Sequence, residues 1–331
     1  MIPIEKIYLQ ICIPTYNRPN KIENQVTRLL KQIGENDRII IVDNNSLDFP
    51  YQSELFNDKR ILFFKNSSNI GICANITESM NYQFCEWSWL LSDDDKITPN
   101  AVNDIKSNIA NYNADFYNYS SLTKREGIKQ FIGVSDFSNK LDNFANLLLM
   151  SNNVYRTSLI TDNKMALYWA CSMSAPHLGP LFFSLANNEF TKGVFCNDQI
   201  VEWGEEDVQN SWDRTCYYNI LFLIDLIKGK DKVIIFNNIK RTLPPLYILA
   251  IQLAYAAKEF GQKSDAIIFF KKISSYYEVL GSSNDKNLAL FCKFLLKAPS
   301  MNYFLISRLY LLIKGKDIKT KLQLRKLSFY I

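Results

Sequence analysis

Short hydrophobic runs alternate with stretches of helical spacing along residues 7–120. The runs predict strands at 7–14, 38–42, 61–64, 87–91 and 114–119, and the stretches between them predict helices at 21–33, 71–84 and 99–111. None of the runs alternates between polar and apolar positions, which is typical of strands buried on both faces. The pattern therefore predicts an α/β fold, in which helices cover both faces of a mostly parallel sheet.

Polar residues cluster directly after each of the first four predicted strands. The four clusters are Thr15–Arg18, Asp43–Ser46, Asn66–Asn69 and Asp93–Asp95. In an open parallel sheet the ligand lies beyond the carboxyl ends of the strands, where these clusters meet. We therefore expect a binding site at this edge.

Beyond residue 122 the pattern becomes irregular and then helical. It predicts a hairpin around 127–135, helices at 141–150 and 176–186, an extended segment at 154–160, and further helices at 220–227, 247–260, 265–280, 288–297 and 303–314. The change in pattern predicts two domains, residues 1–215 with the sheet and residues 216–331 with a helical region.

The composition is that of an ordinary folded protein, because 47% of the 331 residues are hydrophobic and 21% are charged. The seven cysteines are scattered and never in CxxC spacing, which argues against a disulfide framework or a zinc ribbon and favours a reducing cytoplasm. No apolar run reaches the ~18 residues of a membrane-spanning helix. The first residues also lack the basic flank of a secretory signal.

The net charge of +5 is concentrated at the C-terminal end. Residues 285–331 carry ten Lys or Arg and two Asp, so the remaining chain is slightly acidic. A uniformly basic nucleic-acid binder is therefore not expected. The basic, aromatic-rich tail suits the surface of an anionic leaflet, which predicts a peripheral position on the inner face of the cell membrane. Its apolar faces could instead pack on the rest of the protein and leave a solvated basic rim.

Candidate chemistry centres on the acidic triplet Asp93–Asp95. Adjacent carboxylates repel one another unless a cation compensates them, and Mg²⁺ or Mn²⁺ suits such a group together with phosphate oxygens. The alternative is a solvated turn before the next helix. Asp43 could accept a hydrogen bond from a base or ribose, or simply cap the turn to Ser46. The GxGxxG and GxxxxGK[ST] motifs are absent, which argues against NAD, FAD and NTPase sites.

Four motifs stand in the order found in one known family. They are CIPTYNR (12–18), IIIVDNNS (39–46), NSSNIGICAN (66–75) and WLLSDDDKITP (89–99). The chain resembles family 2 glycosyltransferases of the GT-A fold. The WLLSDDD motif is most similar to bacterial O-antigen sugar transferases of the abequosyltransferase-like group.

This resemblance implies a role for each matching position. The positions that match the family's nucleotide-sugar site are Pro14, Thr15, Tyr16, Arg18, Asp43, Asn45, Asn69, Gly71, Asn75 and Asp93. Asp94 matches the metal ligand and Asp95 supports it, while Ser92 stands where the family often has its first aspartate. The implied cofactor is Mn²⁺ or Mg²⁺.

Two places compete for the general base that would deprotonate the acceptor. Residues 203–207 supply a Glu206–Asp207 pair, the residue types that the family uses. The sole histidine, His177, opens a predicted helix at about the expected distance after Val154–Arg156. Its ordinary alternative is a polar residue at a helix start. Inversion or retention at the sugar carbon depends on this choice.

The resemblance implies transfer of a sugar from a UDP-, CDP- or dTDP-sugar to a hydroxyl of a polyprenyl-linked saccharide, in bacterial surface polysaccharide synthesis. A sugar-nucleotide nucleotidyltransferase is a second class, but its glycine-rich loop is missing after the first predicted strand. A third is a degenerate module that binds a sugar or a membrane surface without catalysis.

Overall fold

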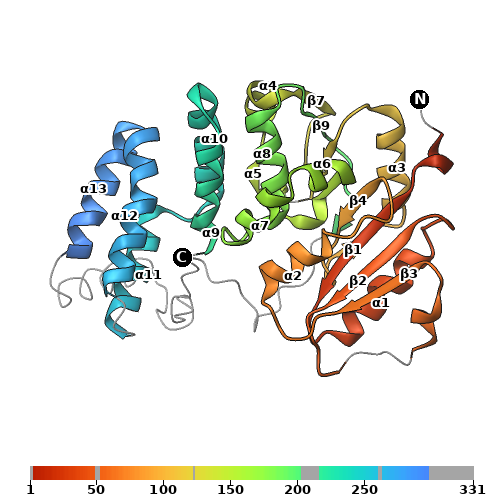
Figure 1. Cartoon of the computed structure of the whole chain (residues 1–331). Helices are drawn as coiled ribbons and strands as arrows, with labels where there is room; N and C mark the ends of the chain where they lie inside the picture. The colour runs from red at the N-terminus through yellow and green to blue at the C-terminus, as the bar shows by residue number, and fades with distance from the viewer. Residues whose placement is uncertain (1–2, 49–52, 122–123, 203–215, 260–262, 298–331) are drawn as a thin grey trace. The chain divides into compact units, whose positions relative to one another are not determined.

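The structure is a computed structural model of the chain, and it describes residues 3–48, 53–121, 124–202, 216–259 and 263–297 (Figure 1). The chain folds into two compact units, Met1–Val208 and Gln209–Ile331. The predicted boundary after residue 215 borders a segment, 203–215, that lies outside the described residues, so it stays a prediction.

The first unit is built on an eight-stranded sheet in the order β3-β2-β1-β4-β8-β6-β9-β7. The first four strands of this order are β3 (Ile61–Lys65), β2 (Arg38–Asp43), β1 (Leu9–Thr15) and β4 (Trp87–Leu90), and they lie side by side in Figure 1. All three pairings among them are parallel, and every residue of β1 is buried. The prediction of a mostly parallel sheet is therefore confirmed for this half.

The other half of the sheet is mixed. Its strands are β8 (Asn153–Arg156), β6 (Phe116–Asn118), β9 (Lys192–Phe195) and β7 (Lys129–Ile132). The strand β8 runs antiparallel between β4 and β6, so the end of the sheet that carries the polar clusters also receives the start of β8. A separate antiparallel pair joins β5 (Lys96–Ile97) to β10 (Val201–Glu202).

Helices cover the parallel strands on both faces, as predicted. They are α1 (Pro19–Leu30), α2 (Ile72–Ser79) and α3 (Ala101–Asn111). Apolar residues of α1 and α3 share one core with alternate residues of β1 and β2, while α2 contacts β1 and β2. The helix predicted from Pro99 begins at Ala101, because Thr98 still bonds through its N–H to Ile200 O beside the β5–β10 pair.

Three predictions between residues 127 and 160 are wrong in detail. The expected hairpin is β7 followed at once by α4 (Gly133–Lys140), and β7 pairs with the distant β9. Gly133 makes this bend possible, because its φ is +71° and a Cβ there would lie 2.7 Å from Glu189 O. The helix expected at 141–150 shrinks to α5 (Phe144–Leu148) and the 3₁₀ helix η3 (Met150–Asn152). The extended segment at 154–160 ends with β8, where α6 (Thr157–Asp162) begins.

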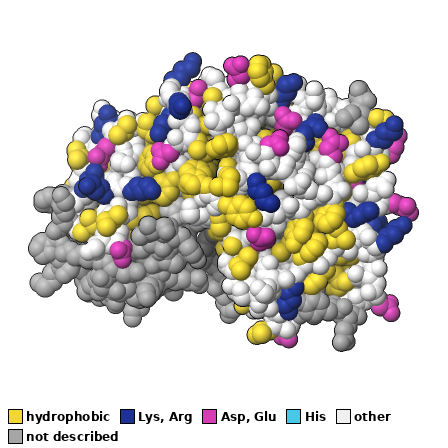
Figure 2. Space-filling view, viewed as in Figure 1, with side chains coloured by type: hydrophobic (Ala, Val, Ile, Leu, Met, Phe, Trp, Pro, Cys, Tyr) yellow, Lys and Arg dark blue, Asp and Glu magenta, His cyan; other side chains and the backbone are white. Residues whose placement is uncertain are grey.

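The remaining elements of the first unit are short. They are η1 (Ile4–Lys6), η2 (Glu54–Asn57), α7 (Lys164–Cys171), η4 (Pro176–Leu178) and α8 (Gly179–Asn187). The last two confirm the short helix predicted at 176–186, and α7 was not predicted. Figure 2 shows hydrophobic side chains gathered over β1–β3 on the face in view. Phe64 of β3 stacks on Tyr82, with ring centroids 4.0 Å apart, and the exposed Phe84 stacks on Phe64 in turn.

The second unit is helical, as predicted. Its elements are α9 (Cys216–Asn219), η6 (Ile220–Leu226), α10 (Gly229–Thr242), α11 (Leu246–Glu259), α12 (Lys263–Leu280) and α13 (Ser283–Lys297). In α13, Ala289 and Cys292 are buried, and Lys293 pairs with Glu278 of α12 at 2.5 Å. This first part of the basic tail therefore packs on its own unit. The predicted helix at 303–314 lies outside the described residues.

In the described ranges we find no helix with the length and apolar character needed to span a bilayer.

Candidate functional site

The polar clusters predicted at the strand ends are joined to one another in the structure. Asn66, after β3, donates to Asn44 Oδ1 at 3.1 Å and to Asn75 Oδ1 of α2 at 2.8 Å. Asn44 in turn donates to Asn69 Oδ1 at 2.8 Å. The ends of β2 and β3 and the first turns of α2 therefore form one connected amide cluster.

The first loop joins this edge through two tight turns. Asn17 and Asn45 have positive φ values of 53° and 65°, a conformation that asparagine adopts more readily than most residues. Asn17 N donates to Ser46 Oγ at 2.7 Å, and Asn17 Oδ1 accepts from Leu47 N at 3.0 Å. These bonds lock the loop after β1 onto the loop after β2.

Asp43 lies at the centre of these turns and is fully buried. Its carboxylate accepts from Ser46 N at 3.2 and 3.1 Å and from Ser46 Oγ, and Lys65 Nζ is 4.0 Å from its Oδ2. The structure thus gives Asp43 the turn-capping role that the sequence left open. Its role in reading a base stays a prediction.

The predicted contacts of a base or sugar lie around this edge. Pro14 and Thr15 are buried at the end of β1, whereas Tyr16 exposes 41% of its surface and so presents a free ring face. Gly71 has a φ of +85° and is the N-cap of α2, and its N–H donates to Asn69 Oδ1 at 2.9 Å. The residues that sequence reasoning grouped are therefore brought to the same strand ends.

Two carboxylates of the acidic loop, Ser92–Asp95, converge on one guanidinium. Arg18 Nη1 lies 2.9 Å from Asp93 Oδ1 and 2.9 Å from Asp94 Oδ2. Asp93 Oδ2 accepts from Thr15 Oγ1 at 2.6 Å, and Asp94 Oδ1 accepts from Ser92 Oγ. Burial raises the pKa of Asp93, although the Arg18 charge and the Thr15 hydrogen bond oppose this shift.

The acidic loop is held from two sides. Gln25 of α1 donates through Nε2 to Ser92 O at 2.9 Å and to Asp95 O at 2.7 Å. From the other side, Ser151 Oγ accepts from Ser92 N at 2.9 Å, and Ser151 O accepts from Trp89 Nε1 of β4 at 2.8 Å. The loop backbone is therefore positioned by both α1 and η3, which directly precedes β8.

The donor set fits a divalent ion that is shared with a phosphate group. Among the residues that the structure describes, no three His, Cys, Asp or Glu side chains gather as a complete metal site. However, Asp93 Oδ1 and Asp94 Oδ2 already point at a common positive group. Mg²⁺-type sites need only one or two carboxylates when phosphates and water complete the shell. Asp95 accepts from Gln25 through its backbone carbonyl, and its supporting role at the metal stays a prediction.

His177 lies in the protein interior, with 4% of its surface exposed. Its Nε2 is 3.1 Å from Leu147 O, a carbonyl to which it can only donate, and its Nδ1 is buried. Burial lowers the pKa of His177 to about 4. Weaker hydrogen bonds of the ring to the backbone at Leu147 and Leu148 oppose this shift. Tyr155 OH also donates to His177 O at 2.7 Å. The other candidate bases, Glu206 and Asp207, lie outside the described residues.

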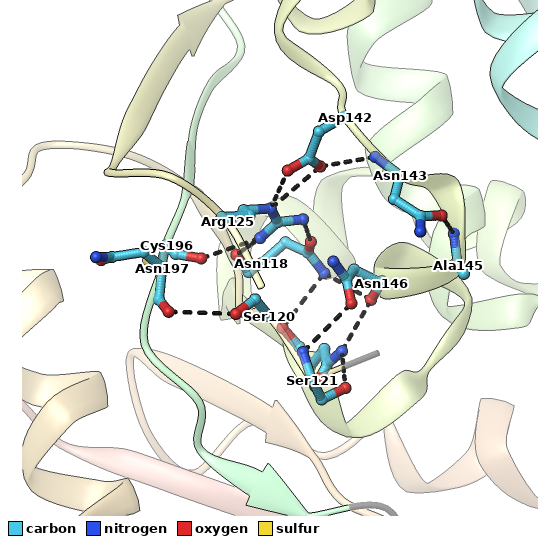
Figure 3. Close-up of polar contacts among 11 residues, drawn as sticks. Asn118, Ser120, Ser121, Arg125, Asp142, Asn143, Ala145, Asn146, Cys196 and Asn197 are labelled. Atoms are coloured by element: carbon cyan, nitrogen blue, oxygen red, sulfur yellow. Dashed lines mark hydrogen bonds and ion pairs between the residues drawn. The ribbon is translucent and has the colours of Figure 1, made fainter. Parts of the chain in front are cut away.

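A second polar group, missed by sequence reasoning, surrounds Arg125 at the ends of β6 and β9 (Figure 3). We call it the Arg125 network, and its members are Asn118, Arg125, Asp142, Asn146, Asn152 and Asn153. Arg125 Nε pairs with Asp142 at 3.1 Å, and its Nη1 donates to Asn118 O at 2.5 Å and to Cys196 O at 3.1 Å.

Asn118 extends the Arg125 network toward the acidic loop. Its Nδ2 donates to Asn153 Oδ1 at 2.8 Å and to Asn146 O at 3.0 Å. Asn152 and Asn153 directly follow Ser151, which holds the acidic loop. No spacing signal marked these residues as a group, because they come from segments far apart along the chain that long-range strand pairing brings together.

Comparison with known proteins decides the family. Residues 10–173 match the family model described as glycosyl transferase family 2. This part of the chain belongs to glycosyl transferase family 2. A 97-residue stretch is 30% identical to WcaA, a colanic acid biosynthesis glycosyl transferase of Escherichia coli K12. The alignment covers 28% of this chain and 35% of that relative, so it spans about a third of the relative's length.

Solved structures share the GT-A fold of this family member. S. aureus TarS 1–349 superposes with a TM-score of 0.63 at 16% identity, over 95% of this chain and 93% of TarS. The mannosyltransferase PcManGT of Pyrobaculum calidifontis, in complex with GDP-Man and Mn²⁺, gives a TM-score of 0.50 at 13% identity, over 93% of this chain and 88% of PcManGT. At these identities the likeness establishes the fold.

Proposed function

We propose that this chain is a metal-dependent glycosyltransferase, which moves a sugar from a nucleoside diphosphate sugar to a hydroxyl of a saccharide acceptor. The observation that carries the proposal is the convergence of Asp93 and Asp94 on one cation at the carboxyl edge of the parallel strands. TarS has been solved with UDP and with UDP-GlcNAc, and PcManGT with GDP-Man and Mn²⁺, which supports a sugar nucleotide as donor.

The chain's own residues have distinct parts in this reaction. Asp94 and Asp93 would hold Mn²⁺ or Mg²⁺, which supplies positive charge to the leaving diphosphate. Arg18 and Lys21 add two further positive charges beside this position. Arg18 Nη1 contacts both carboxylates, and Lys21 Nζ lies 3.9 Å from Asp94 Oδ2. The exposed ring of Tyr16 offers a stacking surface for the base.

The proton acceptor is better assigned to Glu206–Asp207 than to His177. A general base must come within hydrogen-bonding distance of the acceptor hydroxyl. His177 is enclosed and its Nε2 is committed to a carbonyl, so its ring nitrogens are not available to an acceptor hydroxyl. An Asp207→Asn variant should therefore lose transfer to the acceptor, whereas a His177→Gln variant that remains folded should retain it.

We further propose that the product belongs to a bacterial surface polysaccharide, with a lipid-linked acceptor at the inner face of the cell membrane. The match to a colanic acid biosynthesis enzyme supports the product class. The ten basic residues from 285 onward support attachment to an anionic leaflet. The full chain should bind anionic vesicles in a salt-dependent way, and a chain cut after residue 297, which keeps α13, should bind them more weakly. Equal binding of the two forms would contradict the attachment.

The reaction is tested with a panel of sugar nucleotides incubated with the purified protein and Mn²⁺. We expect one donor to release its nucleoside diphosphate slowly in water and faster with a saccharide acceptor. Failure to release a diphosphate from any donor would contradict the proposal. Consumption of a nucleoside triphosphate with a sugar phosphate would instead identify a nucleotidyltransferase.

A further inference from the structure

We propose that Arg18 is an exchangeable counter-cation of the acidic loop. It holds Asp93 and Asp94 until a divalent cation and a diphosphate bind together, and it then moves to the diphosphate. The inference deepens the proposed function and rests on it, because it assumes a diphosphate ligand at this edge.

The hydrogen bonds of the two carboxylates direct one oxygen of each toward a shared cation position. Thr15 occupies Asp93 Oδ2, and Ser92 occupies Asp94 Oδ1. The other oxygen of each carboxylate faces Arg18 Nη1 at 2.9 Å. A divalent ion that uses these two oxygens must therefore compete with the guanidinium.

Burial differs between the two sides of this contact. The Asp93 side chain exposes only 4% of its surface, whereas that of Arg18 exposes 24%. A buried carboxylate needs a compensating charge at all times. Exchange of one cation for another meets this need, because Asp93 never loses its partner.

This arrangement couples the two ligands. A metal ion that binds alone must displace Arg18, and a diphosphate that binds alone must draw Arg18 away from a buried carboxylate. When both bind, each carboxylate and each phosphate has a positive partner. Binding of the metal ion must then raise the affinity for the diphosphate, and binding of the diphosphate must raise the affinity for the metal ion by the same factor. Arg18 sets a large part of that coupling.

The experiment is calorimetric titration of the wild type, Arg18→Gln and Lys21→Gln. Each protein is titrated with Mn²⁺ alone, and with the tightest binder among UDP, CDP and dTDP in the presence and absence of Mn²⁺. Lys21 is the matched control, because its ammonium lies 3.9 Å from Asp94 Oδ2, whereas Arg18 Nη1 lies 2.9 Å from both carboxylates. Circular dichroism confirms that each variant is folded.

We expect Arg18→Gln to bind Mn²⁺ alone roughly tenfold more tightly than the wild type, because two charge-assisted contacts no longer compete. It should bind the diphosphate with Mn²⁺ roughly tenfold more weakly, so the coupling between the two ligands falls. Lys21→Gln should change both affinities by about twofold, as expected for a screened neighbouring charge.

The inference is overturned if Arg18→Gln binds Mn²⁺ no more tightly than the wild type, or if Lys21→Gln has an equal effect. These outcomes differ from failure of the proposed function. In that case the wild type would bind none of the diphosphates, while the titration with Mn²⁺ alone would still test the contact between Arg18 and the two carboxylates.

Discussion

The acidic loop and the Arg125 network are built from the same chemistry but differ in burial. In each, an arginine pairs with carboxylate at the ends of strands, and side-chain amides hold the surrounding backbone. The Arg18 side chain keeps about a quarter of its surface in solvent, whereas the Arg125 side chain has none exposed. Burial lowers the pKa of Arg125, and the nearby Asp142 charge opposes this shift. The difference indicates that one arginine can exchange partners, while the other serves as a fixed support.

The largest expected effect is loss of activity in Asp94→Asn. Removal of this charge takes away one of the two oxygens that converge on the cation position, and we expect turnover to fall about a thousandfold. The matched control is Asp95→Asn, which removes the adjacent carboxylate and should cost far less. Initial rates of diphosphate release measure both. Equal losses of turnover in the two variants would indicate that the metal is held by the triplet as a whole.

Arg125→Met should have the next largest effect, on stability rather than chemistry. It leaves Asn118 O and Cys196 O buried without the Arg125 donor, so we expect the free energy of unfolding to fall by about 3 kcal/mol. Arg18→Met should cost less than Arg125→Met, because water reaches the Arg18 position and Asp93, although it loses its counter-charge, keeps the hydrogen bond from Thr15. Urea denaturation measures both, and similar losses for the two variants would break the comparison.

His177 should make stability depend on pH in a defined direction. Its pKa is about 4 in the folded protein and 6.5 in the unfolded chain, so between these values the unfolded chain binds more protons. Stability should therefore fall as the pH drops from 6.5 toward 4, by about 2 kcal/mol at pH 5 relative to pH 7.5. In His177→Gln this contribution should be absent. An identical pH profile in the variant would show that His177 is not enclosed.

Ser151→Ala should have the smallest effect, and it tests the link between the two regions. The variant leaves Ser92 N without its acceptor, so holding the acidic loop in its present conformation becomes less favourable by roughly 1 kcal/mol. The KM for the donor should rise severalfold with little change in unfolding, while Ser158→Ala at an exposed position should change neither. An unchanged KM would show that the Arg125 network does not reach the acidic loop through Ser151.

The sequence predicted the acidic loop well and the Arg125 network not at all, for a physical reason. Thr15 and Asp43 end buried parallel strands and Asp93 lies three positions after a third, and parallel pairing brings the ends of such strands together. Arg125 and Asn146 lie in segments whose contacts depend on β8 running antiparallel between β4 and β6. Long-range pairing of this kind leaves no local periodicity.

The lack of a local signal for long-range packing also explains why the sequence offered His177 as a candidate general base. Its position near a helix start was predicted correctly, but burial depends on packing with the segment around Leu147. Residue type and spacing carry no signal for that packing. Asp43 shows the opposite case, since its turn-capping bonds to Ser46 are local and were among the sequence-based alternatives.

The most direct test of a diphosphate site at the ends of β1–β4 is a thermal-shift panel. UDP, CDP, dTDP, GDP and ADP are each added to the wild type and to Asp94→Asn, with and without Mn²⁺. At a hundred times its Kd a ligand stabilises the fold by about 2.7 kcal/mol, which raises the melting temperature by a few degrees. We predict such a rise for one diphosphate with Mn²⁺ in the wild type and its loss in the variant. No rise with any diphosphate, or an equal rise in both proteins, would contradict the account.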